Sequence, residues 1–287
     1  MNGISNKTKL DHVAGIEVEE RPVYSASPDN FRNHLQELPR KAIWVKEPDC
    51  ASRFLSVQDQ TFATVHNTDV FRAMDEVAYD KGLDLEVQKA TYLGGKTMAY
   101  FFLPGEEFTV PGDPSVIKPG VLAANHFGGG GKLRFLPTSL RDWCVNGQIS
   151  KVDLAEAVGR VHRGTISYEE IYYMVSKSFD RLADAVETMK LIAEISAGTS
   201  VTDEQIEAFI LSLENKTAKK YQDKLVDVVL DNVDQLGYNA WGVTQGISEM
   251  CEHHMTNEGT KVAWRDNAIE SLLASVGVKE QVAVLTS

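Results

Sequence analysis

The stretch that decides the fold is residues 167–193, SYEEIYYMVSKSFDRLADAVETMKLIA. Its apolar residues recur at alternating spacings of four and three, the period of an amphipathic helix. Ser167 and Glu170 form a capping box, in which each side chain satisfies a free backbone N–H group of the other residue. Gly198 ends the pattern. The sequence therefore predicts one long helix, whose apolar stripe is either core, which we favour, or a seam between subunits. The stripe comprises Tyr168, Tyr172, Val175, Phe179, Leu182, Val186, Met189 and Ala193.

Helical signals continue from this stretch toward the C-terminus. A second capping box, at Thr202 and Gln205, opens a helix that runs to about Leu213. Glycines end the first and the last of the helices that come after it. These further helices are expected at residues 218–236, 239–256 and 261–275.

Upstream of residue 150 the signals are mostly those of strands. Residues 68–81 are the exception, because they carry helical spacing closed by Gly82. Gly94-Gly95 suits a tight hairpin between two strands. Two further strands, at about 121–127 and 132–145, flank a run of four glycines.

Strands followed by a run of helices indicate an α+β fold, with an N-terminal antiparallel sheet, one packed helix and a C-terminal helical half. We expect an N-terminal arm at 1–38, a β-rich region with one helix at 39–150 and a helical region at 151–287. The last two regions are expected to form one continuous domain.

Composition excludes several classes of protein. An apolar content of 43% argues against disorder, and a net charge of −12 disfavours non-specific attachment to nucleic acid or to an anionic membrane. The sequence contains no apolar run long enough to span a membrane, and no signal peptide. The three cysteines, Cys50, Cys144 and Cys251, form no CxxC pair. We therefore expect a soluble protein in the reducing cytoplasm.

The charge reverses locally between residues 118 and 165. This segment carries seven basic and three acidic residues, a net charge of +4, which leaves −16 for the rest of the chain. The acidic residues are Asp142, Asp153 and Glu156. The basic residues are Lys118, Lys132, Arg134, Arg141, Lys151, Arg160 and Arg163.

Within this segment, bases, aromatics and glycines interleave. Single-stranded nucleic acid is held by cations that follow the phosphates and by aromatic rings on which bases stack. The sequence thus allows a nucleic-acid site, although Lys132 and Arg134 as outward residues of an ordinary strand, with Phe135 buried, is the simpler interpretation. The predicted site comprises Phe127, Lys132, Arg134, Phe135, Arg141, Arg160 and Arg163.

Two other kinds of site fit poorly. Residues 128–133, GGGGKL, lack the spacing of a phosphate-binding loop, and Leu133 replaces the hydroxyl residue that would hold magnesium. Glu249, Cys251, His253 and His254 share one predicted helix, but a structural role is the better interpretation. No catalytic constellation, metal site or cofactor is predicted, and the protein is not expected to be an enzyme.

Four short strings resemble a phage- and plasmid-like family catalogued as domain of unknown function 932. They are Ala124-Asn125-His126, residues 141–147 (RDWCVNG), His162-Arg163-Gly164, and residues 239–242 (NAWG) with Glu249 and His253-His254. The resemblance covers roughly residues 40 to 280. It implies a role in the DNA metabolism of a mobile genetic element. By element order alone, the chain is also similar to ring-forming single-strand annealing proteins.

These observations leave two functions open. The first is binding or annealing of single-stranded DNA without ATP, by a chain that forms a homo-oligomer. The second is a structural or interaction protein that forms a homo-oligomer without nucleic acid.

Overall fold

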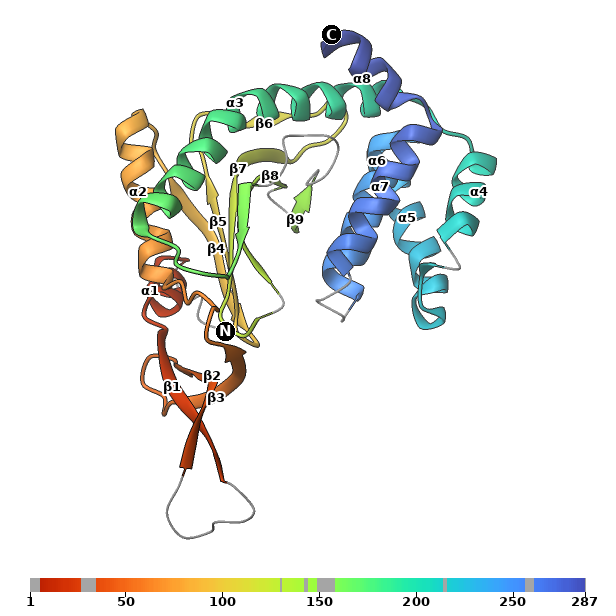
Figure 1. Cartoon of the computed structure of the whole chain (residues 1–287). Helices are drawn as coiled ribbons and strands as arrows, with labels where there is room; N and C mark the ends of the chain where they lie inside the picture. Colours follow the sequence, from red (N-terminus) through yellow and green to blue (C-terminus); the bar gives the residue numbers. More distant parts are fainter. Residues whose placement is uncertain are drawn as a thin grey trace. The chain divides into compact units, whose positions relative to one another are not determined.

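A computed structural model describes residues 6–26, 35–129, 131–141, 144–148, 158–213, 216–255 and 261–286. The fold is α+β, as the sequence predicts, with most strands before most helices (Figure 1). The chain divides into two compact units that do not follow its order. Unit 1 comprises residues 1–104, 121–136 and 157–180. Unit 2 comprises residues 105–120, 137–156 and 181–287.

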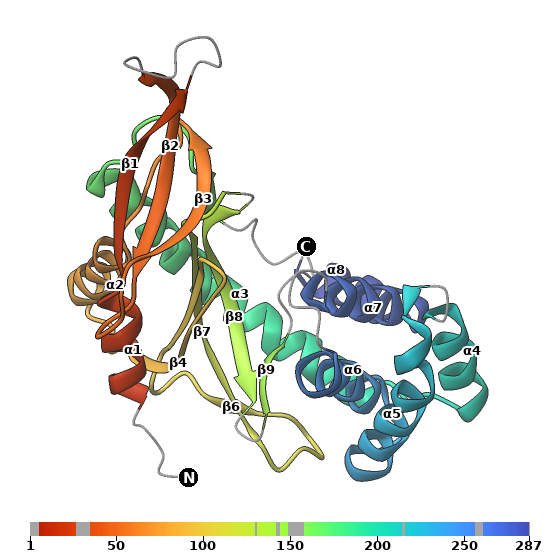
Figure 2. The ribbon, with the colours of Figure 1, turned by 90° about the horizontal axis from the view of Figure 1, so that it is seen from below.

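Unit 1 begins with a helix and a three-stranded antiparallel sheet (Figure 2). The predicted arm contributes a helix and a strand to it, which the sequence did not reveal because residues 17–26 carry only two β-branched side chains, Val18 and Val23. The strand becomes one by pairing with its neighbour. The elements are α1 (Asn6–Ala14), β1 (Glu17–Ala26), β2 (Leu35–Lys46) and β3 (Arg53–Asp59).

A larger sheet of seven strands comes next, with the order β10-β8-β7-β5-β4. The predicted hairpin is confirmed, because Leu93 pairs with Lys96 across Gly94 and Gly95. Both glycines have positive φ, 58° and 85°, which a two-residue turn of this kind requires. The short β6 pairs with β7, and β9 with β8. The strands are β4 (Glu86–Leu93), β5 (Lys96–Phe102), β6 (Phe108–Thr109), β7 (Val116–His126), β8 (Lys132–Arg141), β9 (Cys144–Gln148) and β10 (Val158–Val161).

Two helices cover one face of this sheet in unit 1. Helix α2 (Asn67–Lys81) ends at Gly82, as predicted, and its Phe71 ring lies 5.8 Å from that of Phe101 on β5. Helix α3 (Tyr168–Gly198) packs beside α2, and its Tyr168 hydroxyl donates to the Glu76 carboxylate. Figure 1 shows α2 and the start of α3 on the same side of the strands.

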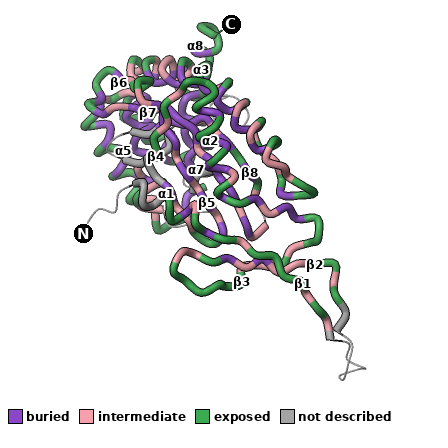
Figure 3. Tube along the Cα trace, turned by 90° about the vertical axis from the view of Figure 1, so that its left-hand side faces the viewer, coloured by how far each residue is buried: buried purple, intermediate pink, exposed green. Residues whose placement is uncertain are grey.

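The capping box that opens α3 is confirmed. The Ser167 N–H donates to the Glu170 carboxylate at 3.0 Å, and the Glu170 N–H donates to the Ser167 hydroxyl at 3.3 Å. The stripe behind it is core from Val175 onward, while Tyr168 and Tyr172 are half-buried. Figure 3 shows buried and exposed positions alternating along the chain in this way.

Unit 2 is largely helical. The second capping box is confirmed by bonds between Thr202 and Gln205. Helices α5 and α6 pack closely, because a Cβ on Gly246 would lie 2.6 Å from the Val229 Cα atom. Trp241 is buried and donates to the Asp113 carboxylate at 2.9 Å. The helices are α4 (Asp203–Leu213), η2 (Lys219–Tyr221), α5 (Gln222–Leu236), α6 (Ala240–Glu249), η3 (Met250–His254), α7 (Lys261–Ser275) and α8 (Val278–Thr286), and of these only α8 was not predicted.

Candidate nucleic-acid interface

On strand β8, the basic residues of the predicted site point to one face of the sheet and its aromatic residue points to the other. Side chains of a strand point alternately to its two faces. Leu133 and Phe135 are fully buried, whereas Lys132 and Arg134 are exposed. Lys132 and Arg134 therefore share one face of the sheet, and Leu133 and Phe135 share the other.

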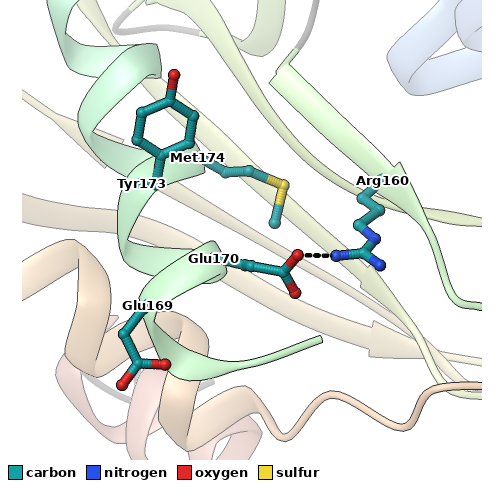
Figure 4. Close-up of a pocket in the computed structure, with 5 residues that line it drawn as sticks. All are labelled: Arg160, Glu169, Glu170, Tyr173 and Met174. Carbon is teal, nitrogen blue, oxygen red and sulfur yellow. Dashed lines mark hydrogen bonds and ion pairs between the residues drawn. The ribbon is translucent and has the colours of Figure 1, made fainter. Parts of the chain in front are cut away.

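Arg160 lies on the face opposite to Lys132 and Arg134. It stands across from Leu133 in the antiparallel pairing of β10 with β8, and residues directly opposite each other share a face. Its guanidinium pairs with the carboxylate of Glu170 on α3 (Figure 4). The prediction that Arg160 joins Lys132 and Arg134 does not fit this geometry, because the register of the two strands turns it toward the helices.

Strand β5 extends the face that carries Lys132 and Arg134. Thr97 and Phe101 contact α2, through a hydrogen bond from Asn67 and through the Phe71 ring. The alternate residues Lys96, Met98 and Tyr100 point away from α2 and are half-buried.

Strand β7 also places alternate side chains on this face. The Asn125 side chain donates to the Asn67 side chain of α2 at 3.0 Å, so the neighbouring His126 points to the face away from α2. We call this surface of unit 1 the second face. It comprises Lys96, Met98, Tyr100, His126, Lys132 and Arg134.

The second face carries two cations, Lys132 and Arg134, that no acidic side chain of the described residues neutralises. Among the residues that the structure describes, no acidic side chain lies within ion-pair distance of Lys132 or Arg134, whereas many other basic residues, such as Lys41, Arg53 and Arg160, are paired. Burial lowers the pKa of His126 below its ordinary value of 6.5, and His162 and Lys96 lower it further. The lowered pKa favours the neutral imidazole, so His126 adds no positive charge to this face at neutral pH.

Phe127 and Phe135 do not lie on a surface. Both are fully buried, and the Phe127 ring packs 6.3 Å from that of Tyr92. Stacking of bases on these two rings therefore does not fit the structure. The alternation Lys-Leu-Arg-Phe at 132–135 carries this information in the sequence, because it assigns Arg134 and Phe135 to opposite faces.

The two remaining arginines of the predicted site are Arg163 and Arg141. Arg163 is exposed and follows β10. It lies near Asp59: bonds from Thr61 lower the pKa of the Asp59 carboxyl, and Arg163 and Arg40 lower it further. Arg141 ends β8, but its side chain is outside the described part of the chain, as is all of Lys151.

The glycine run is packed against β3. The Gln58 side chain donates to the Gly128 carbonyl at 2.6 Å, and a Cβ on Gly129 would lie 2.6 Å from the end of that side chain. The Gly128 N–H donates to Nδ1 of His126 at 3.2 Å. The glycines lead into strand β8 and not into a helix, so the run lacks the architecture of a phosphate-binding loop.

A buried polar cluster brings together two of the strings that resemble the phage- and plasmid-like family. Asn125 donates to the Val65 carbonyl at 2.8 Å, and Nδ1 of His162 lies 2.8 Å from the Ala63 carbonyl. Both side chains thus hold the extended segment before α2. Asn67 of α2 completes the cluster. The cluster was not predicted from the sequence, although an asparagine that follows two alanines on a buried strand was a signal for it.

A shallow pocket of about 290 Å³ lies on the helix side of the sheet (Figure 4). Its lining includes Arg160, Glu169, Glu170 and Tyr173. The two carboxylates and the neutralised guanidinium disfavour a phosphate there. The pocket therefore adds nothing to a nucleic-acid interface.

The candidate metal helix is interrupted by a π-helical turn. Glu249 accepts a bond from Asn232 at 2.9 Å, Cys251 is buried and His253 is exposed. The described residues contain no group of three side chains able to hold a metal ion. Within the same residues, no helix has both the length and the apolar character needed to cross a membrane.

Comparison with known proteins places the chain in a family. The sequence model of a family described as Domain of unknown function (DUF932) matches residues 54–277, more than half of the chain. No curated protein and no solved structure matches.

Proposed function

The chain belongs to the DUF932 family, and from that premise we propose that it binds single-stranded DNA without ATP in the DNA metabolism of a phage or plasmid. The family description assigns no activity, so the proposal depends on the chain's own residues. The strings that resemble a phage- and plasmid-like family support the mobile-element context.

One observation carries the proposal: Lys132 and Arg134 lie side by side on the second face with no acidic partner among the described residues. Two residues apart on one strand, their side chains are spaced about 7 Å apart, close to the spacing of successive phosphates in an extended single strand. Neutralising phosphates with such side chains releases counterions and supplies most of the affinity in non-specific binding.

Tyr100 is the residue best placed for base stacking, in the role that the sequence assigned to Phe127 and Phe135. It lies on the second face, two strands away from Lys132 and Arg134 in the order β8-β7-β5. Sheet faces that combine a central aromatic ring with flanking cations are a common platform for single-stranded nucleic acid. Met98, on the same strand, adds apolar contact area.

The net charge of −12 opposes nucleic-acid binding. Binding is still possible where the basic residues lie together on one face, away from most of the carboxylates. The Debye length is about 8 Å at physiological ionic strength, so distant carboxylates are screened while adjacent cations are not. Binding through the second face should therefore be salt-sensitive and of modest affinity.

The test is fluorescence anisotropy of a labelled oligothymidylate at several salt concentrations. We expect wild type to bind, and Lys132→Ala/Arg134→Ala to bind more weakly, with a salt slope reduced by about 1.4, the value for two lost contacts to a single strand. The control is Lys219→Ala/Lys220→Ala, which removes the same charge from exposed positions of η2.

Two outcomes would contradict the proposal. One is a wild-type chain that does not bind the oligonucleotide at low salt. The other is a Lys132→Ala/Arg134→Ala variant whose affinity and salt slope equal those of the control. The second result would mean that DNA binds away from Lys132 and Arg134. The first result would favour the second function, an interaction protein that forms a homo-oligomer without nucleic acid. The specific observation behind that alternative is the apolar stripe that β2 and β3 leave exposed.

A further inference from the structure

One face of the three-stranded sheet carries apolar side chains that the described residues of its unit leave partly exposed. Trp44 stands opposite Phe54 in the pairing of β2 with β3, and Ala42 stands opposite Val57. Residues that pair directly share a face, so these four form a continuous apolar stripe across two strands. We call this surface the Trp44 face.

Exposure shows which way the Trp44 face points. The alternate residues of β2, Ile43 and Val45, are 0% and 1% exposed, so the other face of the sheet is the packed one. On the Trp44 face, Phe54 is 51% and Val57 is 42% exposed. Figure 3 shows the same contrast, with β3 mostly exposed or intermediate. Large apolar side chains left in contact with water in this way mark interaction sites when they lie together.

The two rings at the centre are held in a defined arrangement. Trp44 and Phe54 meet edge to face, with centroids 5.9 Å apart and planes at 71°. The Arg21 guanidinium lies 4.4 Å from the centroid of the Trp44 ring. Such rigid aromatic anchors, together with arginine, dominate the binding energy of protein interfaces.

Charged residues of β1, β2 and β3 form the rim. Arg21 pairs with Glu19 at 2.7 Å, and Lys46 pairs with Glu17 at 3.4 Å. All four share the Trp44 face, because Glu19 stands opposite Trp44 and Glu17 opposite Lys46. Arg40 stands opposite Asp59 in the pairing of β2 with β3, so this pair shares the face as well. The rim therefore carries three positive and three negative charges and sums to zero, on a chain whose net charge is −12.

We propose that a second copy of this chain docks on the Trp44 face, sheet against sheet across a twofold axis. A twofold interface brings the same surface of both copies together, so the surface must be complementary to itself. Most acidic surfaces of a chain at −12 would repel their own copy. The Trp44 face avoids that repulsion, because each Arg21 can meet the Glu19 of the other copy while the apolar stripes pack.

The charge balance also decides between occupants. Nucleic acid would meet as many carboxylates as cations on this face and would gain no net attraction. A second copy gains from both signs. The inference does not depend on DNA binding, because the second face and the Trp44 face use different residues.

The first experiment measures mass against concentration by sedimentation velocity, without nucleic acid. We expect wild type to dimerise and Phe54→Ala/Val57→Ala to raise the dissociation constant at least about tenfold, as loss of central interface contacts does. The control is Val226→Ala/Leu230→Ala, which likewise shortens two exposed apolar residues, here on α5, and should leave the constant unchanged. Circular dichroism checks that both variants remain folded.

The second experiment uses the rim. Arg21→Glu makes the face −2 and Glu19→Lys makes it +2, so each variant alone should be monomeric, while an equal mixture should form a heterodimer. A wild-type chain that stays monomeric at the highest concentration reached would overturn the inference. So would a dimer that Phe54→Ala/Val57→Ala leaves intact, or a mixture of the charge variants that fails to associate.

Discussion

Arg134 lies opposite Gly159 in the pairing of β8 with β10, and its side chain covers the space that a Cβ on Gly159 would need. That Cβ would lie 3.1 Å from Cγ of Arg134 and 2.7 Å from the carbonyl oxygen of Leu133. Gly159 of the edge strand β10 therefore packs directly against the side chain of Arg134.

Gly159→Ala should destabilise the fold, because backbone cannot move away from the new methyl group as easily as a side chain can. We expect a loss of about 1–3 kcal/mol in the free energy of unfolding, typical of overpacking. Urea denaturation measures it. Gly198→Ala is the control, since a Cβ there meets nothing within 4 Å. Equal stabilities of the two variants would show that β10 accommodates a side chain at this position.

Arg160→Ala should leave DNA affinity within about twofold of wild type, the size of a weak solvent-screened effect. The sequence places Arg160 with the other cations, but the structure turns it toward Glu170 on the helix side. Anisotropy with the same oligonucleotide tests this, alongside Lys132→Ala/Arg134→Ala. A loss of affinity as large as that of the double variant would mean that DNA contacts the helix side of the sheet.

Asn125→Ala should destabilise unit 1 by about 1–3 kcal/mol, the cost of leaving buried polar groups without partners. Asn125 is buried, and its amide is the donor to the Val65 carbonyl and to the Asn67 side chain. Thermal unfolding followed by circular dichroism measures the effect, with the exposed Glu207→Ala as control. If both variants melt at the wild-type temperature, the cluster does not hold the segment before α2.

Stability should fall as pH decreases below about 6.5. Burial lowers the pKa of His162 from its ordinary value of 6.5. The unfolded chain then binds a proton that the folded chain resists, so the contribution of His162 is complete above pH 6.5 and is lost as the pH falls toward the lowered pKa. His162→Gln should flatten the dependence below pH 6.5 in urea titrations. An unchanged pH profile in the variant would assign the effect to other groups, such as His126.

Local signals predicted much of the fold. Each capping box and glycine stop acts within one turn of a helix, so Ser167 with Glu170 and Thr202 with Gln205 revealed where α3 and α4 begin. Strand β1 was missed for the opposite reason. Its polar sequence becomes a strand through backbone pairing with β2, the next strand along the chain, and that pairing leaves no apolar alternation in β1 itself.

The sequence identified the basic residues of the candidate site but not the face of the sheet on which each of them lies. The basic residues are present as counted, yet Arg160 and Arg134 point to opposite faces because of the register between β8 and β10. That register depends on a long-range pairing. Lys96, on a different hairpin, joins Lys132 for the same reason and lies outside the basic segment of the sequence.

Glu170 performs two tasks at once: its carboxylate accepts the Ser167 N–H in the capping box and also receives the Arg160 guanidinium from β10. The first turn of α3 and the edge strand are thus tied to a single side chain. Opening either the first turn of α3 or strand β10 removes a bond from the other. The two segments should therefore exchange their amide protons with solvent as one cooperative group. Substitution of Glu170 should shift both exchange rates together.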